Sequence, residues 1–216
     1  MGGAWSDMVG AQQIISNQGA GTSGQGNAYM QHNTGGDNYA TAVTEFDLLV
    51  NTASSLYYVA SATAINGADM LFTKLQSQGM AGFYNYIGFY VGFNGGGSGG
   101  YGGFMGIAPV TGGRVSIYCT NAGDTMNVDI DEDYNGTVDY HYESSGILGL
   151  GYAFGTGVGI GTYDVGLYDN WQLNGGCGGG GPVLAVSNLV AGGVATVSVS
   201  GASANGLVRT GYSLYG

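Results

Sequence analysis

Strand-like alternation is the feature of this chain that most constrains its fold. Apolar and polar residues alternate with a period of two in segment after segment, and Gly- and Asn-rich breaks separate the segments. No segment has the 3.6-residue period of an amphipathic helix. Because successive side chains of a strand point to opposite faces, such segments bury one face of a sheet. The pattern predicts an all-β protein.

The expected strands are short and close together. In residues 40–50 the even positions would face the core, with Glu45 and Asp47 on the other face. We expect a turn at 76–82 and a flexible loop at 94–102, where glycines cluster. About ten short strands with such turns imply a two-sheet antiparallel sandwich. The other expected strands cover 27–32, 56–62, 69–75, 83–93, 103–108, 114–120, 126–132, 137–143, 147–153 and 163–173.

A glycine-rich linker at residues 175–182 divides the chain into two regions. Residues 1–174 would form the sandwich, and residues 183–216 would form a short β-rich segment. Three strands do not readily close a core of their own. The segment therefore either docks on the sandwich or belongs to a truncated second domain, and we favour truncation. Its strand-like pieces are 183–187, 194–200 and 207–214.

The charge balance disfavours some classes of partner. The chain has 3 Lys+Arg and 14 Asp+Glu, a formal net charge of -11 at pH 7. Nucleic-acid binding needs a basic surface, and docking on anionic membranes needs basic residues as well. No apolar run approaches the roughly 20 residues of a membrane-spanning helix. We expect neither a nucleic-acid partner nor membrane insertion.

The composition is typical of a secreted or cell-surface protein, because Lys is scarce while Gly, Ser, Thr, Asn and Tyr are abundant. The first residues, Met1–Trp5, lack the basic start and apolar stretch of a secretory signal, so we interpret the chain as an excised fragment.

Cys119 and Cys177 each lie at or just beyond the end of an expected strand. A disulfide between them and two separate thiols both stay open. Without CxxC spacing, a zinc site is unsupported.

Six of the 14 acidic side chains lie within residues 129–143, around one turn. A two-residue turn would place the apolar residues of the two flanking strands on opposite faces. A three-residue loop at 134–136 keeps them on one face and pairs Ile130 with Tyr140. It also puts Gly136 at the left-handed position that such a loop requires. We therefore predict the three-residue loop.

This register creates repulsion that a cation would relieve. It places Asp131 opposite Asp139, and like charges directly across a strand pair destabilise a sheet. Ca²⁺ takes six to eight oxygen ligands, often from Asp, Asn and backbone carbonyls. Residues 131–139, with the sequence Asp-Glu-Asp-Tyr-Asn-Gly-Thr-Val-Asp, match the first nine positions of an EF-hand-type calcium loop. They resemble the Asp-rich loops of dockerins and other extracellular calcium modules.

The resemblance implies a set of calcium ligands in this loop: the side chains of Asp131, Asp133 and Asn135, the carbonyl of Thr137, and Asp139 directly or through water. Two features depart from the pattern. Tyr142 stands at the twelfth position, where a bidentate Glu belongs, and the flanks are strands instead of helices. The alternative is a solvated hairpin whose repulsion is screened by water and salt.

One face of the expected strand 83–93 is a candidate sugar-binding surface. Its odd positions suit a core, whereas its even positions carry Tyr84, Tyr86 and Tyr90 beside glycines. Tyrosine rings on an exposed sheet offer flat apolar surfaces with polar tips, on which pyranose rings can stack. The alternative is that tyrosine simply favours strands.

Three segments carry a resemblance to a known fold family: Trp5, the strand Ala42–Asp47 and the closing segment Tyr163–Trp171. Through them, residues 4–174 resemble a concanavalin A-like, laminin G-like jelly roll. The tail, residues 183–193, resembles linker-flanked modules near the ends of secreted bacterial proteins. The resemblance implies a jelly-roll sandwich, accompanied by other domains of the same chain.

Catalytic residues are not evident. Laminarinase-like enzymes on this fold carry Glu-x-Asp-x-x-Glu or Glu-x-Asp-x-Glu on one strand. Glu45 and Asp47 begin that pattern, but Leu49 and Val50 occupy the places of the second Glu. Retaining glycosidases need two carboxyl groups about 5 Å apart. We therefore expect an outward-facing acidic pair without catalytic function.

The favoured hypothesis is a non-catalytic extracellular module that binds a polysaccharide or a glycosylated surface polymer, with calcium stabilising the acidic hairpin. One alternative is a purely structural or adhesive module of a larger surface protein, with no small ligand. The third is a glycoside hydrolase.

Overall fold

The protein is described by a computed structural model that covers residues 5–9, 12–15, 18–21, 27–32, 42–66, 69–93, 99–150, 157–175, 183–187 and 196–200. Sixteen β-strands and two short 3-10 turns, η1 (Asn121–Gly123) and η2 (Leu148–Leu150), lie within these residues. The strands are β1 (Trp5–Val9), β2 (Gln12–Ile15), β3 (Gln18–Gly21), β4 (Asn27–His32), β5 (Ala42–Leu49), β6 (Leu56–Asn66), β7 (Asp69–Gln78), β8 (Tyr84–Phe93), β9 (Gly99–Val110), β10 (Gly112–Thr120), β11 (Thr125–Asp131), β12 (Tyr140–Ser145), β13 (Gly157–Tyr163), β14 (Leu167–Gly175), β15 (Val183–Ser187) and β16 (Thr196–Ser200).

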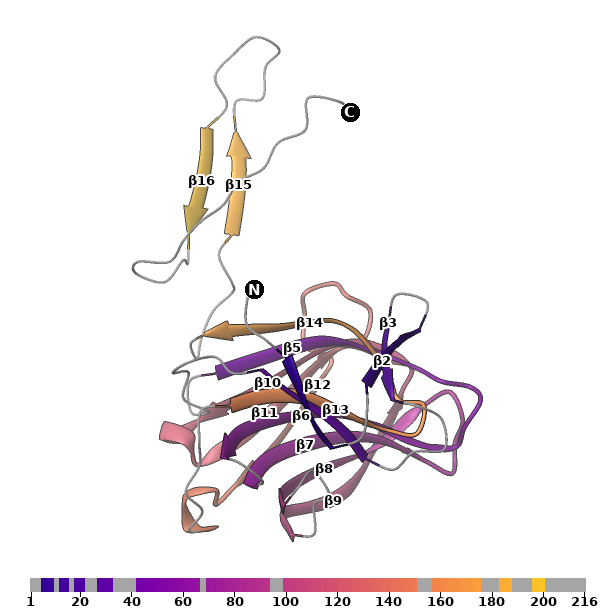
Figure 1. Ribbon diagram of the computed structural model, residues 1–216. Helices are drawn as coiled ribbons and strands as arrows, with labels where there is room; N and C mark the ends of the chain where they lie inside the picture. Colours follow the sequence, from indigo (N-terminus) through magenta and orange to yellow (C-terminus); the bar gives the residue numbers. More distant parts are fainter. Residues whose placement is uncertain are drawn as a thin grey trace. The chain divides into compact units, whose positions relative to one another are not determined.

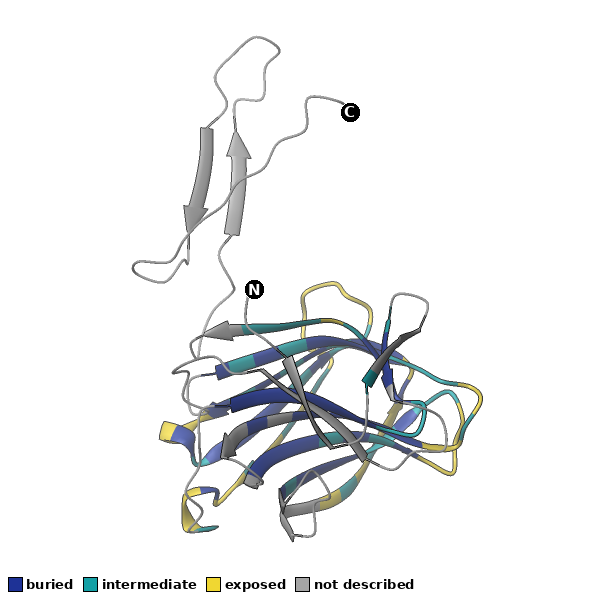
Figure 2. Ribbon diagram, viewed as in Figure 1, coloured by how far each residue is buried: buried dark blue, intermediate teal, exposed yellow. Residues whose placement is uncertain are grey.

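Two antiparallel seven-stranded sheets form a sandwich (Figure 1). Sheet A has the order β1-β4-β13-β6-β7-β8-β9, and sheet B has the order β12-β11-β10-β5-β14-β3-β2. Buried side chains from both sheets, among them Phe46 of β5 and Leu71 of β7, pack in one core between them. The buried residues follow the central strands (Figure 2). The predicted all-β sandwich is confirmed.

The chain divides into two compact units, Met1–Cys177 and Gly178–Gly216. In the second unit, β15 and β16 pair as a two-stranded antiparallel sheet. The third expected piece, 207–214, lies outside the described residues, so truncation of a second domain stays a prediction. Within the described part of the chain, no helix is long and apolar enough to cross a bilayer.

The expected loop at 94–102 is partly wrong. Strand β9 already begins at Gly99, where Val91 of β8 pairs with it. Residues 94–98 lie outside the described residues. Glycine normally weakens a strand, but pairing along β8 keeps this glycine-rich end extended.

The prediction for the two cysteines stays open: Cys119 is buried with its thiol 3.9 Å from the sulfur of Met126, and Cys177 is not described.

Two expected strands also need correction. Segment 147–153 contains the 3-10 turn η2, and its last three residues lie outside the described residues. Segment 163–173 is split between β13 of sheet A and β14 of sheet B. A turn separates them, in which Asp164 has a φ of 53° and the N–H of Gly166 donates to the carbonyl of Tyr163 at 3.2 Å. The chain changes sheets at this turn.

Candidate functional site

The acidic loop, residues 132–139, joins β11 to β12 at the edge of sheet B. The strands pair Val128 with Tyr142 and Ile130 with Tyr140, so the predicted register is confirmed. The predicted three-residue loop is wrong, because the ladder ends at Ile130 and the connection is longer. Beyond Ile130, the backbone N–H groups of the loop donate hydrogen bonds to side chains of the loop itself, and the regular strand pairing does not continue.

Carboxylates hold the backbone of the acidic loop in place. The carboxylate of Asp131 accepts the N–H of Asn135 at 3.0 Å and that of Gly136 at 2.8 Å. The carboxylate of Asp139 accepts the N–H of Glu132 at 2.8 Å. Gly136 has a φ of 84°, the left-handed conformation expected for it. These hydrogen bonds fold the loop back on itself.

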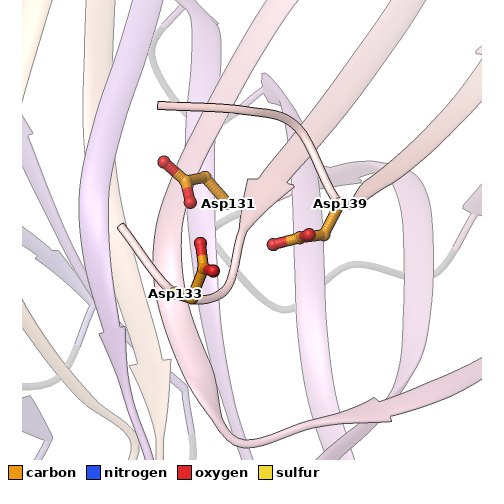
Figure 3. A group of neighbouring side chains, drawn as sticks. All are labelled: Asp131, Asp133 and Asp139. Atoms are coloured by element: carbon orange, nitrogen blue, oxygen red, sulfur yellow. The ribbon is translucent and has the colours of Figure 1, made fainter. Parts of the chain in front are cut away.

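The folded loop brings three carboxylates together. Asp131, Asp133 and Asp139 each offer an oxygen, and these atoms lie within 4.8 Å of one another (Figure 3). Two oxygens across a calcium ion are separated by at most about 5 Å, since each Ca–O distance is 2.3–2.6 Å. A carboxylate oxygen that accepts an N–H keeps a second lone pair for a cation. Three of the five predicted ligands are therefore spaced for one calcium ion.

The other two predicted ligands have different contacts. The side-chain oxygen of Asn135 accepts the N–H of Thr137 at 2.7 Å, and its amide nitrogen donates to Asp133 at 2.8 Å. Asn135 thus donates an N–H of its side chain to Asp133, one of the three clustered carboxylates. Thr137 is exposed in the same loop. The side chain of Asn135 and the backbone N–H of Thr137 thus stabilise the turn that positions the three carboxylates.

The tyrosines of β8 do not share one environment. Ile87 and Phe89 of this strand belong to the core, so Tyr86 and Tyr90 lie on the outer face of sheet A and are half-buried. Tyr84 is instead fully buried in the core, where its hydroxyl donates to the carbonyl of Leu49 at 2.7 Å. Its prediction as a ligand residue is wrong. The register between β8 and β9 shifts between Tyr84 and Tyr86, where the strand's facing changes.

Aromatic rings pack in pairs on the outer face of sheet A, which we call the aromatic face. Its members come from five strands, β6, β7, β8, β9 and β13: Tyr58, Phe72, Lys74, Tyr86, Tyr90, Phe104 and Tyr163. Tyr86 stacks on Phe104 with ring centroids 4.6 Å apart and an interplanar angle of 4°. Phe72 stacks on Tyr90 at 5.3 Å, and Tyr58 on Tyr163 at 5.5 Å.

A glycine lets these rings lie close to the sheet. Gly88 lies between Tyr86 and Tyr90, and a Cβ at this position would come within 3.0 Å of the ring of Phe104 and would also collide with the ring of Tyr90. The rings therefore extend over the backbone of β8. Phe104 is 38% exposed, so this part of the face is open to solvent. The result is a flat, partly exposed aromatic surface.

Lys74 lies among these rings and was not predicted. Its ammonium nitrogen lies 4.3 Å from the ring centroid of Tyr58, 4.8 Å from that of Tyr90 and 5.2 Å from that of Phe72. Burial lowers the pKa of Lys74 to about 8. The sequence does not identify Lys74 as part of the site, because the rings around it belong to three strands, β6, β7 and β8. One signal was available: Lys74 and Phe72 are two residues apart in the expected strand 69–75, and therefore lie on the same face.

The outer face of sheet B is polar. Glu45 accepts hydrogen bonds from Ser116 at 3.1 Å and from Gln172 at 2.7 Å. Asp47 forms an ion pair with Arg114 at 2.6 Å, and its side chain is only 10% exposed. The acidic pair faces outward as expected, but hydrogen bonds hold both carboxylates. A groove of about 220 Å³ on this face is lined by Glu45, Arg114, Ser116, Asp129, Asp131, Gly136, Thr137 and Val138.

Comparison with solved structures identifies the fold. The carbohydrate-binding module CBM66 from Bacillus subtilis has a TM-score of 0.52 and 13% identity, over 79% of this chain and 94% of that chain. The exoplasmic/lumenal domain of VIP36, in its Ca²⁺/Man-bound form, has a TM-score of 0.53 and 12% identity, over 93% of this chain and 91% of that chain.

The protein has a jelly-roll β-sandwich fold. The expected concanavalin A-like architecture is thus confirmed. No protein-family model and no curated protein matched the sequence. At this level of identity the likeness shows the fold, and function has to be argued from the sites.

Proposed function

We propose that this protein is a non-catalytic glycan-binding module whose sugar site is the aromatic face of sheet A. The observation that carries the proposal is the half-exposed stack of Tyr86 on Phe104, next to Tyr90. The fold also supports the proposal, since one similar structure is a carbohydrate-binding module and the other is described in a Ca²⁺/Man-bound form.

The chemistry of the face suits a sugar. A pyranose ring presents C–H groups on its faces and hydroxyls at its rim, so it needs a flat apolar surface bordered by polar atoms. Tyr86 and Tyr90 provide both, because each combines a ring with a hydroxyl. Gly88 leaves no side chain standing between them. A polysaccharide or glycosylated surface polymer would lie across β8 and contact several rings in succession.

Binding to immobilised glycans tests this function. Tyr86→Ala and Tyr90→Ala are each expected to weaken binding of the best ligand by about tenfold or more, the usual effect of truncating a central aromatic contact. Tyr134→Ala is the matched control, because this tyrosine is 53% exposed but lies in the acidic loop of sheet B. Absence of any glycan binding by the unmodified protein would refute the proposal and favour a purely structural or adhesive module.

Calcium has a structural part in the proposal. A cation bound by Asp131, Asp133 and Asp139 would neutralise the repulsion of the three carboxylates and hold the acidic loop against the edge of sheet B. It would take part in no reaction. Because the ligands lie on an exposed loop, we expect affinity in the weak range of extracellular modules, about 10⁻⁴–10⁻³ M. Such a site would be filled outside the cell, in agreement with the proposed secreted or cell-surface location.

Thermal unfolding in EGTA and in Ca²⁺ tests the metal site, with Mg²⁺ for comparison. A ligand at a hundredfold excess over its dissociation constant stabilises the native state by about 2.7 kcal/mol. The rise in midpoint is expected to disappear in Asp131→Asn and Asp139→Asn. Glu143→Gln, a change on β12 outside the cluster, should keep it. An unchanged midpoint at every calcium concentration would leave a solvated acidic loop.

A further inference from the structure

Lys74 occupies the middle of the aromatic face. On β7 it stands opposite Ala60 of β6 and Gly88 of β8. These small neighbours leave the space beside the lysine side chain to the rings of Tyr58 and Tyr90. Its ammonium group is therefore held at the sheet surface, at the same level as the rings that would stack on a sugar.

The hydrogen-bonding capacity of this ammonium is unused within the described part of the chain. An ammonium has three N–H donors, yet no hydrogen bond or ion pair joins Lys74 to another described residue. Arg114 differs, because its guanidinium forms an ion pair with Asp47 at 2.6 Å. Ring faces attract a cation, but they do not replace hydrogen-bond acceptors. A charge in such surroundings is costly unless a partner pairs with it.

We infer that the aromatic face recognises an acidic sugar, and that Lys74 pairs with the carboxylate or sulfate group of that sugar. A hydroxyl of a neutral sugar would also accept a hydrogen bond, but bonds between charged partners are roughly twice as strong. The anion would fill the N–H donors of Lys74, while Tyr86 and Tyr90 stack on the ring that carries it. This inference rests on the proposed function and names its ligand class.

The charge distribution permits such a ligand despite the net charge of -11. In the strand register, Phe72, Gln76, Ala60 and Gly88 are the neighbours of Lys74 on its face, and none of them is acidic. The two outer faces of a sandwich are separated by a core about 10 Å thick, so the carboxylates on the outer face of sheet B lie on the opposite side of the sandwich from Lys74. The carboxylates on the outer face of sheet B and in the acidic loop are Glu45, Asp47, Asp129, Asp131, Glu132, Asp133, Asp139, Glu143 and Asp169.

Matched pairs of polymers test the inference. Polygalacturonate is compared with its carboxyl-reduced form, and κ-carrageenan with its desulfated form, so that the two pairs separate a carboxylate ligand from a sulfate ligand. We expect the unmodified protein to bind at least one acidic polymer about tenfold or more tightly than its neutral counterpart. Lys74→Met, which keeps most of the side chain but removes its charge, should abolish this preference. Lys74→Arg, which keeps the charge, should retain it.

The outcomes distinguish this inference from the proposed function. Equal affinity for the acidic and neutral members of both pairs, or an acidic preference that survives in Lys74→Met, would overturn the inference while glycan binding stands. Failure to bind any acidic or neutral polymer would overturn both.

Discussion

Replacement of Lys74 by methionine is expected to stabilise the folded protein at neutral pH. Burial lowers the pKa of Lys74 from 10.5 to about 8. That difference corresponds to about 3 kcal/mol by which the folded state disfavours the charged form. Attraction between the ammonium and the rings of Tyr58, Phe72 and Tyr90 offsets about 1 kcal/mol of this. Since methionine fills most of the same space without a charge, the net gain should be about 2 kcal/mol.

The stability gained by Lys74→Met should decrease as the pH rises. The folded pKa lies below the unfolded one, so the unfolded chain binds more protons between about pH 8 and pH 10.5. The stability contributed by Lys74 therefore rises with pH through this window, and the advantage of Lys74→Met shrinks. Tyr58 and Tyr90 face the ammonium, and burial raises the pKa of Tyr90. Titration of tyrosines remote from Lys74 affects both proteins alike and cancels in their difference.

Urea unfolding of both proteins at pH 7, 8.5 and 10 measures this difference. Lys74→Arg serves as the control, because its charge persists throughout and it should show neither the gain nor the convergence. A Lys74→Met protein that is no more stable than the unmodified protein at pH 7, with a difference that stays constant up to pH 10, would show that the ammonium is not desolvated.

Three further changes probe other parts of the structure. Gly88→Ala should weaken glycan binding by about tenfold, since its Cβ would displace the rings of Tyr90 and Phe104, and binding isotherms would measure this. Tyr84→Phe removes a buried hydrogen bond to Leu49 and should lower stability by about 1 kcal/mol in urea unfolding without changing glycan affinity. Asp133→Asn should raise the unfolding midpoint in EGTA, by relieving repulsion, and lower it in Ca²⁺, by removing a ligand; a shift of the same sign in both buffers would contradict the metal site.

Alternation in the sequence was sufficient to predict the sandwich and the pairing of Ile130 with Tyr140. A one-residue slip there would have moved a buried set of side chains to the solvent, so one register was strongly favoured. The length of the connecting loop was not predictable in the same way. It depends on the carboxylates of Asp131 and Asp139, which accept backbone N–H groups instead of continuing the ladder.

The candidate sugar site was only partly predictable. Tyr86 and Tyr90 follow from the alternation of one strand, but the burial of Tyr84 depends on a register shift against β9 that β8 alone does not encode. Phe104 and Lys74 join the site through strand neighbours, so pairing across β7, β8 and β9 had to be known first. Sequence alternation defines faces within a strand, whereas a binding surface is assembled across strands.

The central claim, that the aromatic face of sheet A binds glycan, is tested most directly by mapping the contact surface. Backbone amide shifts of isotope-labelled protein would be followed by NMR during titration with the best-binding oligosaccharide. The account predicts that the largest shifts fall at Lys74, Tyr86, Gly88 and Tyr90 on β7 and β8. The largest shifts at residues that line the groove on the outer face of sheet B, such as Ser116, would contradict it.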